Sequence, residues 1–416
     1  MGLEPAPASA RVHVAFFGRR NAGKSSLVNA VAGQDVALVS DVKGTTTDPV
    51  QKAMELAPLG PVVLIDTPGF DDEGGLGELR VQRARRVVNR TDVAVIVAEA
   101  GITEAGVEAE LAAILRAAGI PFLVALNKAD VLPALPVEGP GEFTGDVARI
   151  PVSAKTGFNI DALRAAIVQL ASGTAAASPK SLVAGIVSAG DLAVLVVPID
   201  AGAPAGRLIL PQQQTIRDIL EAGAGALVTR DTELTAALGR LAAAPALVIT
   251  DSQAFAEVAR AVPPEIPLTS FSILFARRSG ALESSLAGAA VLDRLGDGDR
   301  VLVCEGCTHR RRCDDIGTVK LPRMIRRHTG AEPDFVFQSG GDFPDDLSPY
   351  ALVLHCGACM LGAAETRSRR LAAERQGVAF TNYGIAIAKM TGVLQRSVAV
   401  FTAAVFTAAG FADNNG

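Results

Sequence analysis

The chain has 416 residues, and 49% of them are hydrophobic, which is enough for two or three domains with packed cores. The formal net charge is −5 and only 4% of the residues are aromatic, so the composition indicates no general affinity for nucleic acid or for anionic membranes. The sequence starts without a secretory-signal pattern, and the apolar segment 397–412 is shorter than the ~17–25 residues of a membrane-spanning helix. We therefore expect a cytoplasmic protein.

The first motif follows an apolar run, Val12 to Phe17, that has the length of a buried strand. Residues 18–25 read Gly-Arg-Arg-Asn-Ala-Gly-Lys-Ser, and a helix is expected over 24–32. In such a loop the backbone N–H groups cradle phosphates, Lys24 reaches the β- and γ-phosphates, and Ser25 holds Mg²⁺. The residues expected at the phosphates are Gly18, Asn21, Ala22, Gly23, Lys24, Ser25 and Ser26.

Apolar runs alternate with helical patterns through residue 172, which predicts an α/β domain with a mostly parallel, doubly wound sheet. The expected strands are 61–65, 92–98, 121–126 and 148–152. Polar motifs follow three of them, where such sheets bind ligands. Asp66-Thr-Pro-Gly69 comes first, and we expect Asp66 to join the Mg²⁺ shell and Gly69 to sense the γ-phosphate.

The two remaining motifs point to the base of a nucleotide. Asn127-Lys128-Ala-Asp130 places a carboxylate where it accepts hydrogen bonds from N1–H and the 2-amino group of guanine, which adenine does not offer. Residues 153–155, Ser153-Ala154-Lys155, are expected to close over that base. The sequence therefore predicts a guanine nucleotide site.

This set of motifs resembles the small GTPase superfamily, and Gly44-Thr-Thr-Thr-Asp48 is similar to switch I of the TrmE/Era group. The resemblance implies that Thr46, with Thr45 as the alternative, completes the Mg²⁺ shell. It also implies that Asn21 holds K⁺. Phe70 stands where other GTPases place a water-orienting Gln, so we expect slow intrinsic hydrolysis. Glu78 has the spacing of a general base, but we favour a solvent-exposed helix residue.

Residues 173–181 are small and polar, which indicates a linker before a second, smaller α/β domain over 182–265. Strands are expected at 182–188, 192–199, 226–229 and 246–250, and helices at 212–222 and 232–242. This domain has no phosphate loop, cysteine or histidine. Its long apolar strands indicate an interface as readily as a site.

All five cysteines and three of the four histidines lie in the third α/β domain, 266–416. One cluster, Cys304-Glu-Gly-Cys307-Thr-His309, follows an expected strand at 300–303, and another, His355-Cys356-Gly-Ala-Cys359, follows one at 351–354. Adjacent strand ends would bring them together. From the residues alone two sites remain open, a structural zinc site with four cysteines or an iron–sulfur site, besides packed free cysteines.

Cys307-x-His309, His355-Cys356-x-x-Cys359 and residues 313–323 are similar to the signature of the HydF family of [FeFe]-hydrogenase maturation GTPases, as is the order of domains. The resemblance implies a [4Fe-4S] cluster on Cys307, Cys356 and Cys359, with His309, His355 or Glu305 as the fourth ligand. It leaves Cys304 unassigned, and we take Cys313 as structural.

The resemblance also implies a function. The protein would be a GTP-hydrolysing scaffold that assembles the diiron subcluster and delivers it to apo-[FeFe]-hydrogenase, working with radical-SAM hydrogenase maturases. The middle domain would form a homodimer, with a tetramer as the larger assembly. The alternative is a TrmE/Era-like RNA-associated GTPase with a Cys₄ zinc module, which the acidic charge balance disfavours.

Three helices are expected downstream of the second cysteine cluster. Residues 362–375 predict a helix with arginine and glutamate on its exposed side, while 384–390 and 394–408 predict alanine- and valine-rich helices in a core or a subunit contact.

Overall fold

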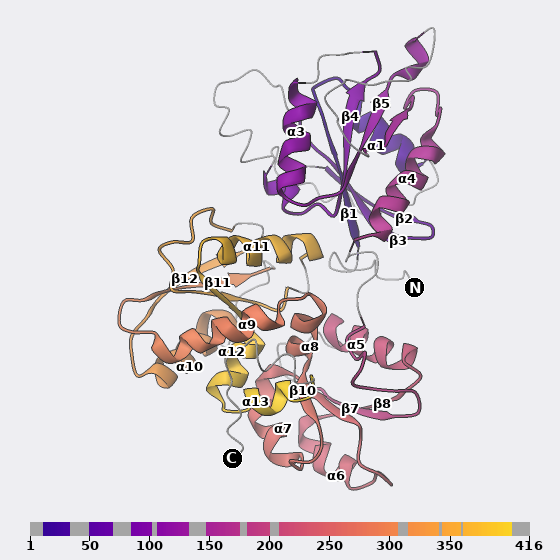
Figure 1. Ribbon diagram of the computed structural model, residues 1–416. Helices are drawn as coiled ribbons and strands as arrows, with labels where there is room; N and C mark the ends of the chain where they lie inside the picture. The colour runs from indigo at the N-terminus through magenta and orange to yellow at the C-terminus, as the bar shows by residue number, and fades with distance from the viewer. Residues whose placement is uncertain are drawn as a thin grey trace. The chain divides into compact units, whose positions relative to one another are not determined.

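The computed structural model describes residues 11–33, 50–69, 85–101, 106–132, 147–174, 181–199, 208–306, 315–340, 343–358 and 361–401. The chain divides into two compact units, one of residues 1–179 with 361–368 and one of residues 180–360 with 369–416 (Figure 1). Several residues of the expected sites lie outside the described residues: Thr45, Thr46, Phe70, Glu78, Cys307, His309, Cys313 and Cys359.

The first unit is built on a six-stranded sheet with the order β2-β3-β1-β4-β5-β6. Its strands are β1 (Val12–Phe17), β2 (Val50–Leu56), β3 (Gly60–Asp66), β4 (Val93–Glu99), β5 (Phe122–Asn127) and β6 (Arg149–Pro151). Neighbouring strands run parallel, except that β2 pairs antiparallel with β3. The mostly parallel sheet is confirmed. Strand β2 was not predicted, because this edge strand is only partly buried and carries Gln51, Lys52 and Glu55.

Helices cover both faces of this sheet, which explains why β1 is buried along its whole length. Helices α1 (Lys24–Ala32) and α4 (Ile160–Ser172) pack on one face, against Val14 and Phe16. Helix α3 (Gly106–Ala117) packs on the other face, against Ala15 and Phe17 (Figure 1). A strand buried on both sides reads as a continuous apolar run, and that is the pattern of Val12 to Phe17.

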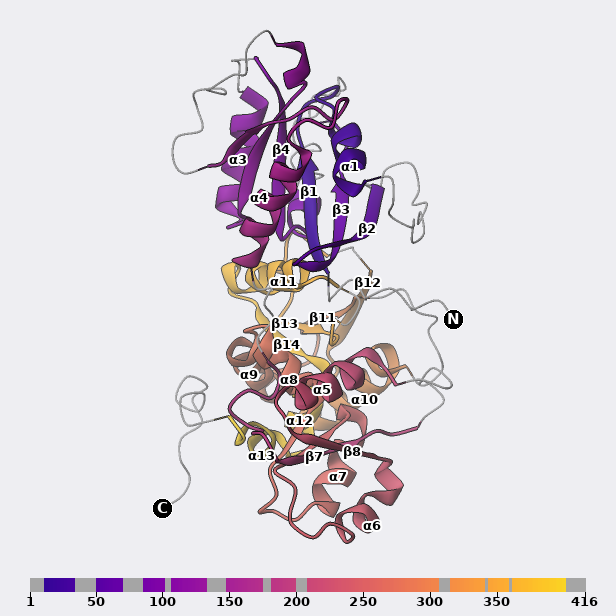
Figure 2. The ribbon, with the colours of Figure 1, turned by 90° about the vertical axis from the view of Figure 1, so that its right-hand side faces the viewer.

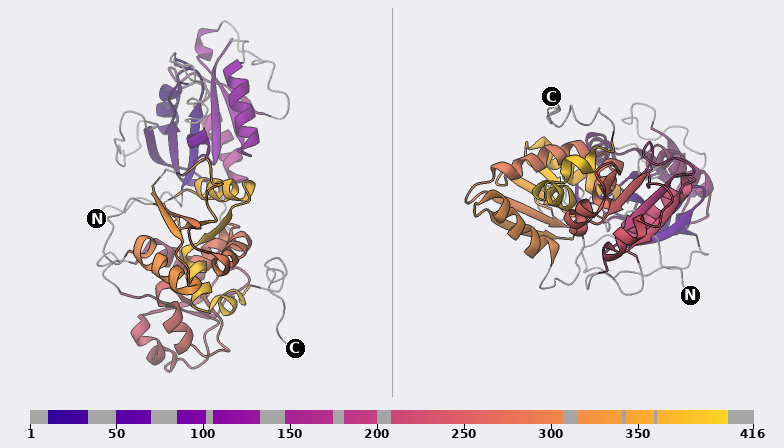
Figure 3. Two further views of the ribbon diagram at one scale, coloured as in Figure 1. Left: turned by 90° about the vertical axis from the view of Figure 1, so that its left-hand side faces the viewer. Right: turned by 90° about the horizontal axis from the view of Figure 1, so that it is seen from below.

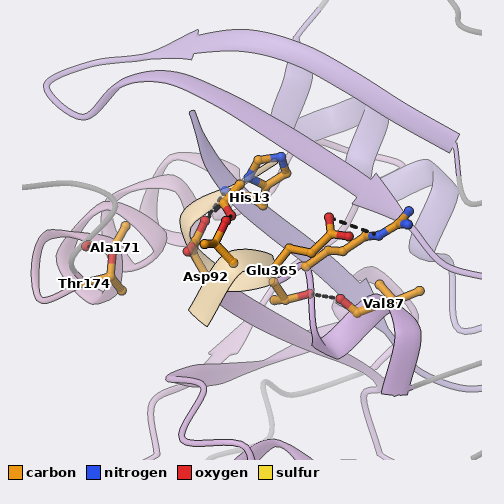
Figure 4. Close-up of polar contacts among 10 residues, drawn as sticks. His13, Val87, Asp92, Ala171, Thr174 and Glu365 are labelled. Carbon is orange, nitrogen blue, oxygen red and sulfur yellow. Dashed lines mark hydrogen bonds and ion pairs between the residues drawn. The ribbon is translucent and has the colours of Figure 1, made fainter. Parts of the chain in front are cut away.

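Polar contacts fix β1 at the end away from the loop that follows Phe17 (Figure 4). The backbone N–H of His13 donates to Oδ2 of the buried Asp92 at 2.9 Å, just before β4 begins. The hydroxyl of the preceding Thr91 donates to the carbonyl of Val87 at 2.7 Å. The central strands are therefore tied at this end, and the phosphate loop lies at the other.

The second unit holds two four-stranded parallel sheets (Figure 2). The first has the order β10-β9-β7-β8, with β7 (Leu192–Val196), β8 (Gly225–Thr229), β9 (Leu247–Thr250) and β10 (Leu268–Ser270). The second has the order β12-β11-β13-β14, with β11 (Arg300–Glu305), β12 (Asp334–Ser339), β13 (Leu352–His355) and β14 (Ala379–Asn382). The helices are α5 (Leu210–Glu221), α6 (Leu234–Leu238), α7 (Phe255–Ala261), α8 (Phe271–Arg278), α9 (Leu282–Ala289), α10 (Leu321–Thr329), α11 (Ala363–Arg375), α12 (Tyr383–Met390) and α13 (Leu394–Val398).

One hydrophobic core joins the two sheets of this unit, whose ribbons Figure 3 draws from two further sides. It contains Leu195 and Ile249 from the first sheet, Val303 and Leu354 from the second, and Ile385 from α12. The opposite face of the second sheet has a smaller apolar cluster, in which Ala373 of α11 packs on strand residues. The two sheets therefore depend on a shared interior.

Three elements expected from the sequence differ from the secondary structure observed in this unit. The strand expected at 182–188 is wrong, because the segment forms turns, with Gly185 at φ 72°. Oδ2 of Asp218 on α5 accepts from the Val183 N–H at 3.1 Å, so a side chain replaces a neighbouring strand there. The helix expected at 232–242 is shorter, as α6 spans Leu234–Leu238 after a 3₁₀ turn. The helix expected at 394–408 ends at Val398 as α13, and residues beyond 401 lie outside the described part.

No helix among the described residues combines the length and the apolar character needed to cross a bilayer.

Gly288 tests the close packing of α9 on β14. A methyl group there would overlap the carbonyl oxygen of Phe380 and lie 2.6 Å from its carbonyl carbon, both in backbone that cannot move aside alone. We expect Gly288→Ala to lower the free energy of unfolding of this unit by about 1–3 kcal/mol in urea denaturation. The control Gly239→Ala, whose new methyl group meets its nearest atom, Thr235 O, at 3.5 Å, should change it by about 0.5 kcal/mol or less. Equal stability of the two variants would contradict the packing.

Candidate functional site

The loop after β1 is shaped by backbone that only certain residues adopt. Gly18, Asn21 and Gly23 have positive φ angles of 150°, 62° and 89°. A side chain at Gly18 would overlap the carbonyl oxygen of Val97, and one at Gly23 would overlap the side chain of Asn127. Glycine is therefore required at both positions. The loop curls around the N-terminus of α1, which is the geometry of a phosphate cradle.

Lys24 contacts this loop and is only 7% exposed. Its ammonium group donates to the carbonyls of Gly18 at 3.0 Å and Arg19 at 2.7 Å. The side chain thus crosses the mouth of the cradle, where it would meet the phosphates of a nucleotide. Ser25 and Ser26 are exposed on the first turn of α1, so their hydroxyls are open to a ligand.

The carboxylate expected at the magnesium ion ends β3, beside the end of β1. Asp66 pairs with Phe16 in the sheet register, and the Thr67 hydroxyl donates to the Phe16 carbonyl at 2.7 Å. Oδ1 of Asp66 is buried and has no hydrogen-bond partner among the described residues. A buried carboxylate oxygen left in this state fits a cation site. Ser25 and Asp66 would thus hold Mg²⁺.

Gly69 touches the phosphate loop directly. A methyl group at this position would lie 2.9 Å from Cα of Arg20, so only glycine permits the approach. The backbone of the Asp-Thr-Pro-Gly turn therefore lies against the loop that would hold the phosphates.

The motif after β5 joins the phosphate loop to the loop after β6. The side chain of Asn127 is buried, donates to the carbonyl of Ala22 at 2.9 Å, and accepts from the N–H of Ala154 at 3.1 Å. Lys128 has a left-handed backbone with φ 63°, and its ammonium lies 2.6 Å from Oε2 of Glu99. Asn127 thus links the phosphate loop to the loop expected at the base of the nucleotide.

Asp130 is exposed on a 3₁₀ turn, Ala129–Val131, where a base would be read. A hydrogen bond from Ser153 is the main reason why the pKa of Asp130 lies below its usual range, with a further contribution from the charge of Lys155. Asp130 is therefore ionised at neutral pH and is ready to accept hydrogen bonds. Ser153, Ala154 and Lys155 come to the same place, as the motif predicts.

Glu108 is a site residue that the sequence did not reveal. It is buried on α3, and its Oε1 lies 3.1 Å from Nε of Arg19 in the phosphate loop. A single glutamate in a helix carries no sequence signal, so only the fold shows that it anchors the loop.

In the second unit, two neighbouring strands bring the cysteine clusters together. In the pairing of β11 with β13, Cys304 lies opposite His355. The Cys356 N–H donates to the Cys304 carbonyl at 2.8 Å, and the Gly306 N–H approaches Sγ of Cys356 at 3.1 Å. The expectation that adjacent strand ends place the clusters at one point is confirmed for these residues. Cys307 is the next residue in the sequence.

Cys356 has the surroundings of a metal-binding thiolate. Besides the Gly306 N–H, the N–H of Ala358 points to its Sγ at 3.4 Å. Two N–H donors stabilise negative charge on sulfur. Ala358 has a left-handed φ of 55°, and a side chain at Gly357 would meet no atom of the described residues within 4 Å. Cys356 therefore fits an iron or zinc ligand.

Cys304 has different surroundings. Its side chain is fully buried in an apolar cluster with Leu302, Leu347, Val353 and Phe380. Burial raises the pKa of its thiol to about 12, against a smaller lowering by the charge of Arg369. It is thus a protonated core residue. Glu305 is the next residue, and a methyl group at Gly317, on the π-helix Ile316–Lys320, would overlap its Oε1.

His355 is buried with both ring nitrogens engaged. Nδ1 lies 2.8 Å from the carbonyl oxygen of Cys356, and Nε2 lies 3.3 Å from Nη1 of Arg369. The carbonyl only accepts and the guanidinium only donates, so Nδ1 carries the proton and Nε2 the lone pair. Burial, and then the charge of Arg369, lower the pKa of His355 to about 4, so the ring is neutral.

Arg369 corrects the expectation for α11. The helix was expected to expose its arginines, yet Arg369 is only 3% exposed. The first eight residues of α11, Ala-Ala-Glu-Thr-Arg-Ser-Arg-Arg, have the composition of a surface helix. The partners that bury Arg369, Gly340 and His355, come from other segments of the chain.

Within the part of the chain that the structure describes, no three His, Cys, Asp or Glu side chains gather into a metal site. Of the expected iron–sulfur ligands, Cys356, His355 and Glu305 lie among the described residues, and both ring nitrogens of His355 are already engaged.

Comparison with known proteins agrees with this division. Residues 13–128 match the family of the 50S ribosome-binding GTPase. The chain is 40% identical over 164 residues to the tRNA modification GTPase MnmE of Synechococcus sp. (strain JA-3-3Ab), covering 38% of this chain and 34% of that protein. It is 36% identical over 162 residues to MnmE of Azoarcus sp. (strain BH72), covering 38% and 35%. The chain thus spans about a third of the length of these relatives.

Among solved structures, Era of Aquifex aeolicus bound to GDP·AlF₄⁻ is similar with a TM-score of 0.32 and 18% identity, covering 52% of this chain and 92% of that one. The G domain of the FeoB iron transporter of T. maritima is similar with a TM-score of 0.28 and 20% identity, covering 39% and 99%.

The remainder of the chain matches two further families. Residues 182–280 match the hydrogen maturase F dimerization domain, and residues 283–400 match the hydrogen maturase F tetramerization domain. The first unit is a P-loop GTPase domain, by its family match and by its loop geometry. Since both later domains carry the same family name and follow a GTPase domain, the chain belongs to the hydrogen maturase F family.

Proposed function

We propose that this protein is a GTP-hydrolysing scaffold of [FeFe]-hydrogenase maturation, which binds a [4Fe-4S] cluster at the ends of β11 and β13. It would assemble the diiron subcluster there and deliver it to apo-hydrogenase. The observation that carries the proposal is the approach of the two cysteine clusters, with the Gly306 N–H 3.1 Å from Sγ of Cys356. Membership of the hydrogen maturase F family supports the same assignment.

In this proposal Cys307, Cys356 and Cys359 hold the cluster. The fourth iron position is left to Glu305 or His309, because both nitrogens of His355 are engaged. The bound cluster would supply an iron with an exchangeable ligand, which suits a carrier that must release its cargo. The protein contributes the two strand ends and the N–H groups that stabilise the thiolate of Cys356.

The GTPase domain would act as a timer. Ser25, Asp66 and Thr46 would hold Mg²⁺, Lys24 the phosphates, and Asp130 the guanine base. GTP and GDP would then stabilise different arrangements of the switch segments, and so different contacts with apo-hydrogenase and the radical-SAM maturases.

The dimerization and tetramerization domains make oligomers part of the proposal. The first sheet of the second unit ends on β8, and Val228 on that strand is 43% exposed. An apolar edge strand is a ready surface for pairing with a second chain. A homodimer would form through this edge, and a tetramer through a second surface.

The alternative with a Cys₄ zinc module has less support. It needs Cys304 as a ligand, and that thiol is buried among Leu302, Leu347 and Phe380. The relatives that modify tRNA match the GTPase region only.

The cluster proposal is tested by colour. Anaerobically reconstituted protein should be brown, and Cys356→Ser should abolish the visible absorption and the bound iron. Cys304→Ala is the matched control, and it should keep both, because Cys304 lies in the apolar cluster. Colourless wild-type protein with stoichiometric zinc would refute the proposal.

Lys24→Ala should lose GTP hydrolysis but stay brown, because the two sites lie in different units.

Asp130 tests the choice of base. Asp130→Asn replaces an acceptor by a donor, so GTP affinity should fall about 10–100-fold, the value of one or two hydrogen bonds to a charged group. Xanthosine triphosphate offers a carbonyl in place of the 2-amino group, and its affinity should rise. Both are measured by isothermal titration with Mg²⁺. Unchanged GTP affinity would remove Asp130 from the base site.

Asn21 tests the role of a monovalent cation. Its side chain is exposed on the phosphate loop, where an oxygen ligand for K⁺ would stand. A cation there would compensate charge on the leaving phosphates, so hydrolysis should be faster in KCl than in NaCl at equal ionic strength. Asn21→Ala should remove the difference. Equal rates of the wild-type protein in the two salts would contradict the potassium site.

A further inference from the structure

We propose that Arg369 is a positioning residue for the cysteine site. Its buried guanidinium holds His355, His355 holds the Cys356 turn, and the fixed positive charge makes a cluster at this site easier to reduce. The inference rests on the proposed cluster site and adds a residue that neither the cysteine motifs nor the expected ligands include.

The first step is the set of contacts made by Arg369. Nη2 donates to the carbonyl of Gly340 at 2.7 Å, and Nη1 donates to Nε2 of His355 at 3.3 Å. The guanidinium carbon lies 5.4 Å from the ring centroid of Phe343. A buried cation is costly unless such partners surround it. Arg369 therefore connects α11 with the segment after β12 and the end of β13.

The second step joins these segments to both cysteine-bearing strands. The N–H of Gly340 donates to the carbonyl of Glu305 at 2.8 Å, so the residue held by Arg369 also holds the end of β11. On the other side, Nδ1–H of His355 donates to the carbonyl of Cys356 at 2.8 Å. The side chain of Arg369 thus holds the backbone at the ends of both β11 and β13, through Gly340 and His355. Removing it would free both turns at once.

The third step concerns charge. One-electron reduction adds a negative charge to a cluster, and a nearby cation in a low-dielectric interior favours the reduced form. Arg369 is only 3% exposed, so water screens its charge weakly. Neutralising Arg369 should make the cluster harder to reduce.

The experiment compares full-length reconstituted wild type with Arg369→Gln, Arg369→Lys and the control Arg375→Gln. Arg375 ends the same helix and is exposed, so its loss removes an equal charge in water. The reduction potential is followed by EPR during titration with dithionite, and iron loss by transfer to a chelator. Arg369→Gln should shift the potential to more negative values, whereas Arg375→Gln should not. Arg369→Lys keeps the charge but loses the planar fork, so its potential should stay near that of wild type.

The positioning role has its own readout. Both Arg369 variants should lose iron about tenfold faster than wild type, the effect of one lost hydrogen bond to a charged group. GTP hydrolysis, which resides in the other unit, should not change. If Arg369→Gln does not fold, iron loss from Arg369→Lys decides, and a wild-type rate there overturns the proposal. A wild-type potential and iron-loss rate in a folded Arg369→Gln variant also overturn it. Wild-type protein that binds no cluster would instead refute the proposed function.

Discussion

Parallel pairing of β11 with β13 places Cys304 opposite His355, and the whole cysteine site follows from that register. Carboxyl ends of parallel strands meet at one edge of a sheet, so the residues that follow each strand become neighbours although about 50 positions separate them. Successive side chains of a strand point to opposite faces of the sheet, so neighbouring residues of β11 have different surroundings. Cys304 enters the apolar cluster, while Glu305 and the Cys356 turn lie beyond it. A shift of one residue would exchange these environments and bury the wrong groups.

The nucleotide site uses the same arrangement in the first unit. The motifs after β1, β3, β5 and β6 meet because those strands share one sheet, and direct contacts then fix their spacing. Asn127 reaches both the phosphate loop and Ala154, and Gly69 lies against Arg20. These contacts require glycine or a particular amide rather than a general residue class. The motif residues therefore hold the loops of the site in place, besides supplying the groups that would bind the nucleotide.

Much of this was predictable, because the motifs are local. A strand buried on both faces, such as Val12–Phe17, reads as a continuous apolar run, and the polar residues after it mark the loop. The edge strand β2 carries no such pattern. The segment 182–188 is as apolar as a strand, but Asp218 from α5 satisfies its backbone. Arg369 and Glu108 were invisible in the sequence, since their partners are distant and a lone charge usually indicates a surface. Contacts between distant segments, which a sequence pattern does not encode, decided the segment 182–188, Arg369 and Glu108, whereas β2 pairs with the neighbouring β3 and lacks only an apolar pattern.

The common interior of the two sheets in the second unit bears on how this chain can be divided. A cut near residue 265 would open that interior and expose Leu195 and Ile249 on one fragment and Val303 and Leu354 on the other. Fragments of this kind tend to aggregate. Anyone building chimeras from this family should therefore transplant the dimerization and tetramerization regions as one cassette that begins near residue 180, where the second compact unit starts.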